Sequence, residues 1–211
     1  MTVLVTDHHE IPFKDVDGER IYMRSEADAI VNPHQKTCTF PYKDLCGAGV
    51  AWAVIVALYE KNNIEQREVE DLLEFVAFAT VGDIMSLTGL NRILVKEGLK
   101  RIHHTTNIGM RALVSQCGLL PEQIDTYHFG FVLGPCINAA GRLDTAHRAL
   151  RLFISESPEE AAEIADELVV LNEERKEMTR QGVEEAKQLV EEGGYEKDPV
   201  LILYLPDVHE S

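Results

Sequence analysis

The chain has 211 residues, of which 45% are hydrophobic and 27% charged, and its formal net charge is −16. This is the composition of a soluble globular protein, long enough for one large domain or for one domain and part of a second. No run of about 18 apolar residues occurs, and the N-terminus lacks the basic segment of a signal peptide, which argues against a membrane span and against secretion. None of the four cysteines stands in a C-x-x-C pair, so we expect reduced thiols in the cytoplasm and no zinc site.

The charge is distributed unevenly along the chain. Residues 155–198 hold 15 acidic and 5 basic residues and so carry −10 of the −16. The segment 92–111 is instead basic, with Arg92, Lys96, Lys100, Arg101 and Arg111. The overall acidity argues against binding to nucleic acid. The basic segment predicts either a local patch that faces phosphates or a solvated helix face.

The first half of the chain is expected to begin with short strands and continue with helices. Residues 2–6 and 29–32 have the pattern of buried strands, residues 10–28 that of a polar loop, and residues 33–46 that of an irregular segment. Apolar runs and helical spacing then predict four helices, the first two of them buried. They cover residues 47–59, 69–80, 91–103 and 107–117.

In the second half, residues 129–133 are expected to form a strand, residues 134–142 a loop rich in small residues, and residues 145–154 a helix. Ser157, Pro158 and Glu160 form a clear helix start, and the helix is predicted to run to about Glu192. Its second half is polar, which favours a helix that bridges two domains. A final strand is expected at 199–205. We therefore expect a first domain at residues 1–154, a long linking helix at 155–194, and the start of a second domain at 195–211.

Asp7, His8 and His9 follow the first predicted strand. Ligands of open α/β sheets bind beyond the carboxyl ends of strands. A carboxylate beside an imidazole suits a divalent metal, and a mixed oxygen and nitrogen set suits Mn²⁺ better than Ca²⁺. The alternative is a polar turn at the end of a strand.

Two further segments carry candidate residues. Asp83 ends an apolar helix and is either an exposed cap or a ligand of a metal shared with His8. Asn138 and Arg142 lie in an Asn-Ala-Ala-Gly-Arg segment. Its small residues would let the backbone approach a ligand, and its arginine suits a phosphate. The alternative for this segment is a tight turn with a surface arginine.

Taken together, these motifs resemble the RecJ-type branch of the DHH phosphoesterase superfamily. Asp7-His8-His9 is similar to the signature that names the superfamily. Together with this motif, four further segments resemble motifs of the family and occur in the same order along the chain. These four segments are Asn32-Pro33 with residues 41–51, Ala79 to Asp83, Leu90 to Arg101, and Gly134 to Leu143. The implied fold is α/β: the C-terminal part of a parallel-sheet domain that is mostly helical after the second strand. A long bridging helix and one strand of a second domain of the DHHA1 type would follow.

The resemblance also implies roles for the candidate residues. His8 and Asp83 would bind metal, Asp7 would bind it or orient a histidine, and His9 would contact the scissile phosphate or the attacking water. Asn138 and Arg142 would hold substrate phosphate, and Arg142 would also have a catalytic role in stabilising the charge that develops during hydrolysis. The implied activity is 5′-to-3′ hydrolysis of single-stranded DNA in repair and recombination, with Mn²⁺ or Mg²⁺, two ions in the complete enzyme. A single-strand-binding protein or a helicase would be a partner.

The sequence also departs from the family pattern. The family has an Asp-x-Asp pair and a further aspartate on strands before the DHH motif, and most of its C-terminal domain lies beyond the long helix. We therefore expect an internal part of a family protein with little or no activity of its own. Asp15-Val16-Asp17-Gly18 imitates the missing motif but follows the DHH motif, so we reject it. The alternatives are a phosphodiesterase for short oligonucleotides or cyclic dinucleotides, and a scaffold without catalysis that binds a partner.

Overall fold

A computed structural model describes residues 1–23, 25–143, 146–195 and 199–206, without the side chains of residues 140, 142 and 143. The chain forms two compact units. Unit 1 comprises Met1–Thr105 and Leu120–Phe131, and unit 2 comprises Thr106–Leu119 and Val132–Ser211. The fold class is α/β, as expected. The predicted division at residues 154 and 194 stays a prediction.

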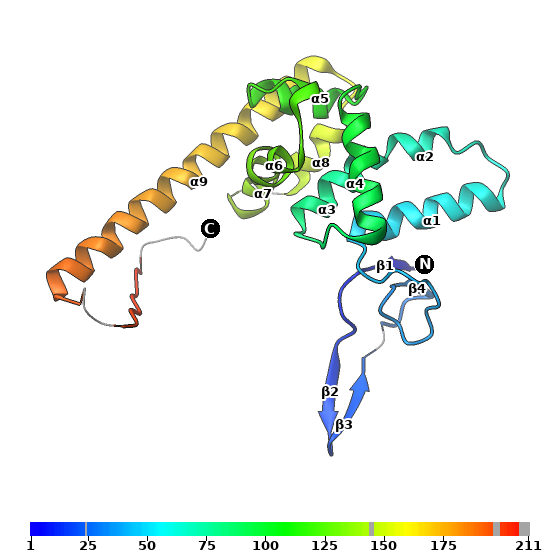
Figure 1. Cartoon of the computed structure of the whole chain (residues 1–211), viewed down its shortest axis with the longest axis horizontal. Helices are drawn as coiled ribbons and strands as arrows, with labels where there is room; N and C mark the ends of the chain where they lie inside the picture. The colour runs from blue at the N-terminus through cyan, green and yellow to red at the C-terminus, as the bar shows by residue number, and fades with distance from the viewer. Residues whose placement is uncertain (24, 144–145, 196–198, 207–211) are drawn as a thin grey trace. The chain divides into compact units, whose positions relative to one another are not determined.

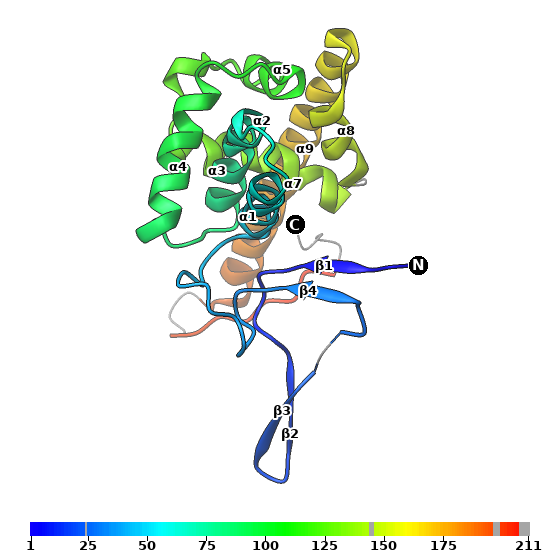
Figure 2. The same cartoon turned by 90° about the vertical axis from the view of Figure 1, so that its right-hand side faces the viewer.

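Unit 1 begins with two short strands that lie side by side (Figure 2). Strands β1 (Leu4–Thr6) and β4 (Ala29–Val31) pair in parallel, with Leu4 opposite Ala29 and Thr6 opposite Val31. Both strands were predicted, but as buried strands, and only the central residues Val5 and Ile30 are half-buried. Because they are parallel and in register, the residues that follow them come to the same end of the sheet.

The segment between these strands corrects the prediction of a polar loop. It contains an antiparallel hairpin of β2 (Phe13–Val16) and β3 (Glu19–Tyr22), which extends away from β1 and β4 (Figure 1). Asp17 and Gly18, with φ of 52° and 85°, form the two-residue turn. Two positive φ angles in sequence suit an Asp-Gly turn in a hairpin. The segment that imitates an Asp-x-Asp motif is therefore part of an exposed hairpin.

Four helices of unit 1 follow: α1 (Gly47–Lys61), α2 (Arg67–Asp71), α3 (Leu73–Gly82) and α4 (Gly89–Ile102). The single helix predicted at 69–80 is interrupted at Leu72. There the Trp52 indole donates to the Val69 carbonyl at 2.8 Å, which satisfies that carbonyl from outside the helix. The helix predicted at 47–59 is less buried than expected, because only Gly49 and Val50 of α1 are buried.

The core of unit 1 lies where α1, α3 and α4 meet. It consists of buried aliphatic side chains: Leu45, Val50, Leu73, Val76 and Leu94. Gly98 of α4 faces α3, and a Cβ there would overlap the Leu73 carbonyl and the Ala77 methyl group. Glu74 is also buried and accepts a hydrogen bond from Thr105 at 2.8 Å. Burial raises the pKa of this carboxyl group.

The second segment of unit 1 contains two short elements, the 3-10 turn η1 (Pro121–Gln123) and α6 (Thr126–His128). The π-helix η2 (Phe129–Leu133) then leads into unit 2, which corrects the strand predicted at these residues. Asp125 and His128 form a capping box that starts helical structure here. Phe129 is fully buried and meets the Phe78 ring edge-on at 5.3 Å. An apolar run of this length fits a buried helix turn as well as a strand.

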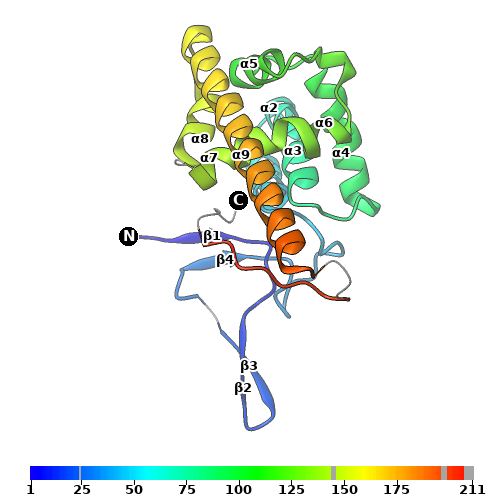
Figure 3. The same cartoon turned by 90° about the vertical axis from the view of Figure 1, so that its left-hand side faces the viewer.

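Unit 2 consists of helices α5 (Ile108–Gln116), α7 (Gly134–Leu143) and α8 (Ala146–Ile154), which pack against the long α9 (Pro158–Gly193) (Figure 3). Helix α7 corrects the loop predicted at 134–142, since its small residues let it pack closely: Cys136 and Ala139 are buried. Helix α9 was predicted well, with Ser157 Oγ accepting from the Glu160 amide at 3.2 Å. The final predicted strand is absent from the described residues 199–206, and residues 207–211 lie outside the described part.

No helix within the described residues is long and apolar enough to span a membrane.

Candidate metal centre

The polar residues after β1 are held in place mainly by one carboxylate. Asp7 Oδ1 accepts hydrogen bonds from the amides of His8 and His9, at 2.8 Å and 3.3 Å. It also pairs with His9 Nδ1 at 2.7 Å. The hydrogen bond with the His9 side chain and those from the two amides lower the pKa of Asp7, against a smaller opposing effect of burial. Asp7 is therefore an ionised acceptor that fixes the turn and the His9 ring.

Asn32, at the end of β4, supports the same turn from the neighbouring strand. This side chain is only 2% exposed. Its amide donates to the His9 carbonyl at 2.9 Å and to Asp7 Oδ2 at 3.3 Å, and its oxygen accepts from the His34 amide at 2.8 Å. The parallel register of β1 and β4 brings Asn32 beside the residues that follow Thr6.

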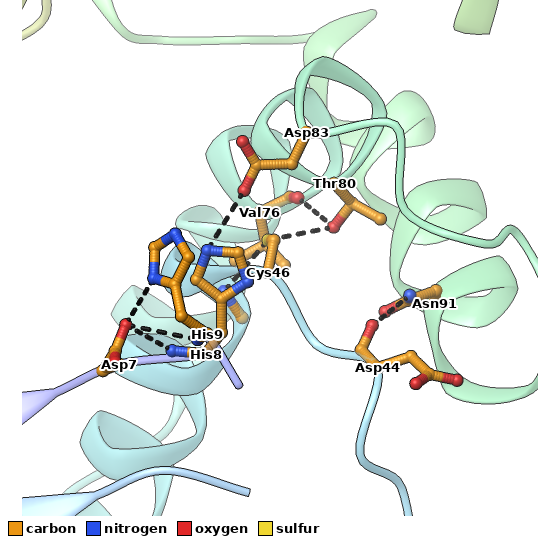
Figure 4. Close-up of polar contacts among 10 residues, drawn as sticks. Asp7, His8, His9, Asp44, Cys46, Val76, Thr80, Asp83 and Asn91 are labelled. Atoms are coloured by element: carbon orange, nitrogen blue, oxygen red, sulfur yellow. Dashed lines mark hydrogen bonds and ion pairs between the residues drawn. The ribbon is translucent and has the colours of Figure 1, made fainter. Parts of the chain in front are cut away.

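His8 and His9 point to different surroundings. The His8 side chain is 19% exposed and its Nε2 lies 3.7 Å from Asp83 Oδ2 (Figure 4). It passes close to Gly47, the first residue of α1, whose ideal Cβ position is 3.5 Å from His8 Cδ2. The His9 side chain is instead 77% exposed. His8 thus faces Asp83, whereas His9 contacts Asp7 and is otherwise open to solvent.

Asp83 is the residue that ends α3. The next two residues close the helix, with the Ile84 amide donating to the Val81 carbonyl and the Met85 amide to the Thr80 carbonyl, both at 3.1 Å. This pair of bonds is the Schellman arrangement, which usually has glycine at the left-handed position. Ile84 occupies that position here with φ of 55°, and it is 90% exposed. A β-branched residue in this region is strained.

Buried contacts between α1 and α3 set the separation of His8 and Asp83. The Thr80 hydroxyl donates to the Val76 carbonyl at 2.6 Å and lies 3.4 Å from the Cys46 sulfur (Figure 4). Cys46 caps α1 by accepting from the Gly49 amide at 3.4 Å. Both Cys46 and Thr80 are fully buried. The start of α1 is therefore tied to the last turn of α3, next to Asp83.

The His8 and Asp83 pair has a donor set suited to a divalent cation. Its separation of 3.7 Å is too long for a hydrogen bond. Ligands that bind one octahedral ion at about 2.1 Å lie about 3 Å apart at adjacent positions and about 4.2 Å apart at opposite ones. The 3.7 Å between the His8 nitrogen and the Asp83 oxygen lies between these two values, so binding one ion would require the two side chains to shift by several tenths of an ångström. Among the described residues, however, no three His, Cys, Asp or Glu side chains come together as a metal cluster.

The other predicted site residues belong to unit 2. Asn138 is exposed on α7. The Arg142 backbone is part of the same helix, and its side chain lies outside the described residues. In the basic segment of unit 1, Arg101 forms ion pairs with Glu70 and Asp71 at 2.6 Å and 2.8 Å. Its charge is therefore used within the protein rather than presented to a phosphate.

Reasoning from the sequence missed the residues that position this site. Asn32 carried a signal, because it is the last residue of a predicted strand and Asp7 directly follows the other one. Cys46 and Thr80 carried little, because their contact joins residues 34 positions apart.

Comparison with known proteins connects these motifs to one group of enzymes, although no family model matches the chain. The chain is 35% identical over 222 residues to the single-stranded-DNA-specific exonuclease RecJ of Salmonella typhimurium, covering 99% of this chain and 37% of that protein. It is 33% identical over 202 residues to the exonuclease of the same name from Bacillus subtilis, covering 96% of this chain and 24% of that protein. The chain thus spans about a third or less of the length of these curated relatives.

Solved structures of RecJ proteins also resemble the fold of this chain. RecJ of Thermus thermophilus in complex with Mn²⁺ matches with a TM-score of 0.74 and 29% identity, over 99% of this chain and 29% of that one. A structure of exonuclease RecJ bound to manganese matches with a TM-score of 0.72 and 30% identity, over 87% of this chain and 43% of that one.

Proposed function

Because this chain belongs to the RecJ family and corresponds to part of the length of its members, we propose that it contributes to a metal-dependent nuclease. The proposed reaction is 5′-to-3′ hydrolysis of phosphodiester bonds in single-stranded DNA, in repair and recombination. The observation that carries this proposal is the approach of His8 Nε2 to Asp83 Oδ2, between a strand end and a helix end.

We assign the cation ligands to His8 and Asp83, with Mn²⁺ or Mg²⁺ as the ion. When bound, such an ion supplies Lewis-acid stabilisation of phosphate oxygens and a water of lowered pKa. The donor chemistry supports this assignment, because nitrogen and carboxylate oxygen ligands suit Mn²⁺. Two ligands leave most coordination positions to water, so we expect weak binding to this chain alone.

The neighbouring residues would act on the substrate. Asp7 accepts three hydrogen bonds at one oxygen, so we assign it the role of orienting His9 rather than that of a principal ligand. His9 uses Nδ1 toward Asp7 and is otherwise exposed, which leaves Nε2 for a phosphate oxygen or the attacking water. Asn138 and Arg142 are proposed to hold substrate phosphate, because an amide and a guanidinium group donate to its oxygens.

The location and partners follow from the same proposal. We place the protein in the cytoplasm, in keeping with four free cysteines. An exonuclease for single strands needs proteins that expose or cover such strands, so a helicase or a single-strand-binding protein is proposed as a partner.

The first test is calorimetric titration of Mn²⁺ into this chain. We expect His8→Ala and Asp83→Asn each to weaken binding at least tenfold, about 1.4 kcal/mol, because each removes one of two ligands. Asp15→Asn is the matched control, since Asp15 is an exposed carboxylate on the hairpin. Equal binding by wild type and all three variants would refute the assignment.

The same preparations should be incubated with end-labelled single-stranded oligonucleotides of several lengths and with a cyclic dinucleotide. We expect negligible hydrolysis by this chain, because only two cation ligands converge within the described residues. Robust hydrolysis of long single strands that Asp83→Ala abolishes would contradict the expected inactivity. A preference for the shortest substrates would instead favour an oligonucleotide phosphodiesterase.

A further inference from the structure

Unit 2 brings together two cysteines that the sequence keeps 19 residues apart. Cys117 follows the last residue of α5, and Cys136 lies in the first turn of α7. Their sulfur atoms are 3.9 Å apart, within contact distance. We propose that Cys117 and Cys136 form an oxidation-sensitive dithiol, which closes to an intramolecular disulfide when hydrogen peroxide reacts with it. This inference does not depend on the proposed nuclease function.

The geometry requires only a small movement for this bond to form. A disulfide has an S–S length of about 2.05 Å, so the sulfur atoms must approach by about 1.9 Å. Rotation about the two Cα–Cβ bonds is the motion that would bring the sulfurs closer. The other two cysteines belong to unit 1, where the Cys46 sulfur is already engaged with the Gly49 amide and Thr80.

The surroundings of the pair favour a thiolate at Cys136. The Cys117 thiol donates to that thiolate and so lowers the pKa of Cys136, although burial opposes the effect. The same hydrogen bond, together with burial, raises the pKa of Cys117. The Lys176 ammonium group on α9 favours the thiolate, and the Asn172 amide adds to this at Cys136, whereas Glu173 opposes it. In the structure the Cys136 thiol donates to the Val132 carbonyl at 3.3 Å, and the Cys117 thiol and the Lys176 ammonium group stabilise the Cys136 thiolate once that proton has left.

Access to the pair is through Cys117. This residue is half-buried, whereas Cys136 is 2% exposed. A small oxidant such as hydrogen peroxide suits this partial access better than a bulky disulfide does. Because Cys136 is buried, a disulfide between the two sulfurs is favoured over a disulfide with a second protein.

The proposed reaction balances. The Cys136 thiolate attacks one peroxide oxygen, the O–O bond breaks, and the leaving hydroxide takes up a proton to form water. The Cys117 sulfur then attacks the sulfenic acid, the S–O bond breaks and a second water leaves. Two thiols have lost two electrons and two protons to one peroxide. A dithiol reductant returns both, so the bond would be transient in a reducing compartment.

The bond would have a defined structural effect. Cys117 and Cys136 both belong to unit 2, whereas Leu120–Phe131 between them belongs to unit 1. A disulfide would close a covalent ring that contains this whole segment, so that oxidation reduces the conformational freedom of the unfolded chain. It would also fix the first turn of α7, the helix that carries Asn138.

The test uses the reduced 211-residue chain treated with hydrogen peroxide, followed by alkylation of remaining thiols and peptide mass spectrometry without reduction. We expect one cross-link, between the peptides with Cys117 and Cys136, which dithiothreitol reverses. The midpoint of thermal unfolding should rise on oxidation. Cys38→Ser, which changes the other half-buried cysteine, should behave as wild type, and Cys117→Ser should show neither cross-link nor shift.

The wild-type peptide map decides the matter whether or not the variants fold. Alkylation of both Cys117 and Cys136 at a peroxide concentration that oxidises Cys38 would overturn the proposal. A cross-link between any other pair of cysteines would overturn it as well.

Discussion

The two sides of the candidate metal centre are built from contacts of different range. On the strand side, Asp7 is bound to its two neighbours and to Asn32 on the adjacent strand. On the helix side, Asp83 depends on the packing of α3 against α1 and α4, and on the strained residue Ile84 that follows it. A short hydrogen-bonded turn therefore holds one side, and a helix core and a strained helix end hold the other.

This difference indicates what each side contributes. The carboxylate on the strand side is occupied by hydrogen bonds and orients its neighbours. The carboxylate on the helix side is 48% exposed, and His8 is its ion-pair partner among the described residues. Strain beside a functional group persists where the surrounding structure enforces it, and such strain occurs often at ligand sites. The helix side is therefore the better candidate to receive a cation.

Breaking the helix side should have the largest effect on stability. Gly98→Ala places a methyl group against the Leu73 carbonyl and the Ala77 side chain, which forces α3 and α4 apart. We expect a loss of about 3 kcal/mol in the free energy of unfolding, measured by urea denaturation. Gly82→Ala is the control, because a Cβ there meets nothing within 4 Å. Equal stability of the two variants would contradict the close packing.

Breaking the strand side should cost less. Asn32→Ala removes three partly buried hydrogen bonds, to His9, Asp7 and His34. We expect a loss of about 2 kcal/mol in urea denaturation and weaker binding of Mn²⁺, because His8 and His9 lose their support. Asn62→Ala, at the exposed end of α1, should lose about 0.5 kcal/mol and bind Mn²⁺ as wild type does. Unchanged Mn²⁺ binding by Asn32→Ala would show that the turn at Asp7–His9 does not contribute to the metal centre.

Relieving the strain beside Asp83 should have the smallest effect, in the opposite direction. Ile84→Gly puts glycine at a left-handed helix end and removes a side chain that is 90% exposed. We expect a gain of about 1 kcal/mol in the free energy of unfolding. The same substitution at Ile93, an exposed helical residue of α4, should lose about 1 kcal/mol. A loss at both positions would show that Ile84 is not strained.

Local signals predicted the parts of the fold that depend on local contacts. Ser157, Pro158 and Glu160 gave the start of α9, and the helix predicted at residues 107–117 is present as α5. The hairpin at residues 13–22 was missed although Asp17-Gly18 is a strong turn signal, because the polar composition of its strands outweighed their alternation. The strand predicted at residues 129–133 was wrong, because an apolar pentapeptide fits a buried helix turn equally well.

The candidate site was also predicted only where it depends on local contacts. Asp7, His8 and His9 were placed at a strand end from their neighbours alone, and that position is confirmed. From the residues alone, the approach of Asp83 to His8 was one of two alternatives, because it depends on contacts such as that between Cys46 and Thr80. Tertiary contacts of this kind leave no periodic pattern in the sequence.

The interleaving of the two units constrains how the chain folds during synthesis. Domains generally fold as units as they leave the ribosome, the N-terminal one first. Unit 1 is incomplete until Phe131 has been made, because Phe129 fills part of its interior. The segment Thr106–Leu119 must in turn wait for α9, on which α5 packs. Neither unit is therefore obtained by cutting the chain once, and a nascent chain must keep its apolar α5 protected until nearly all of the protein has emerged.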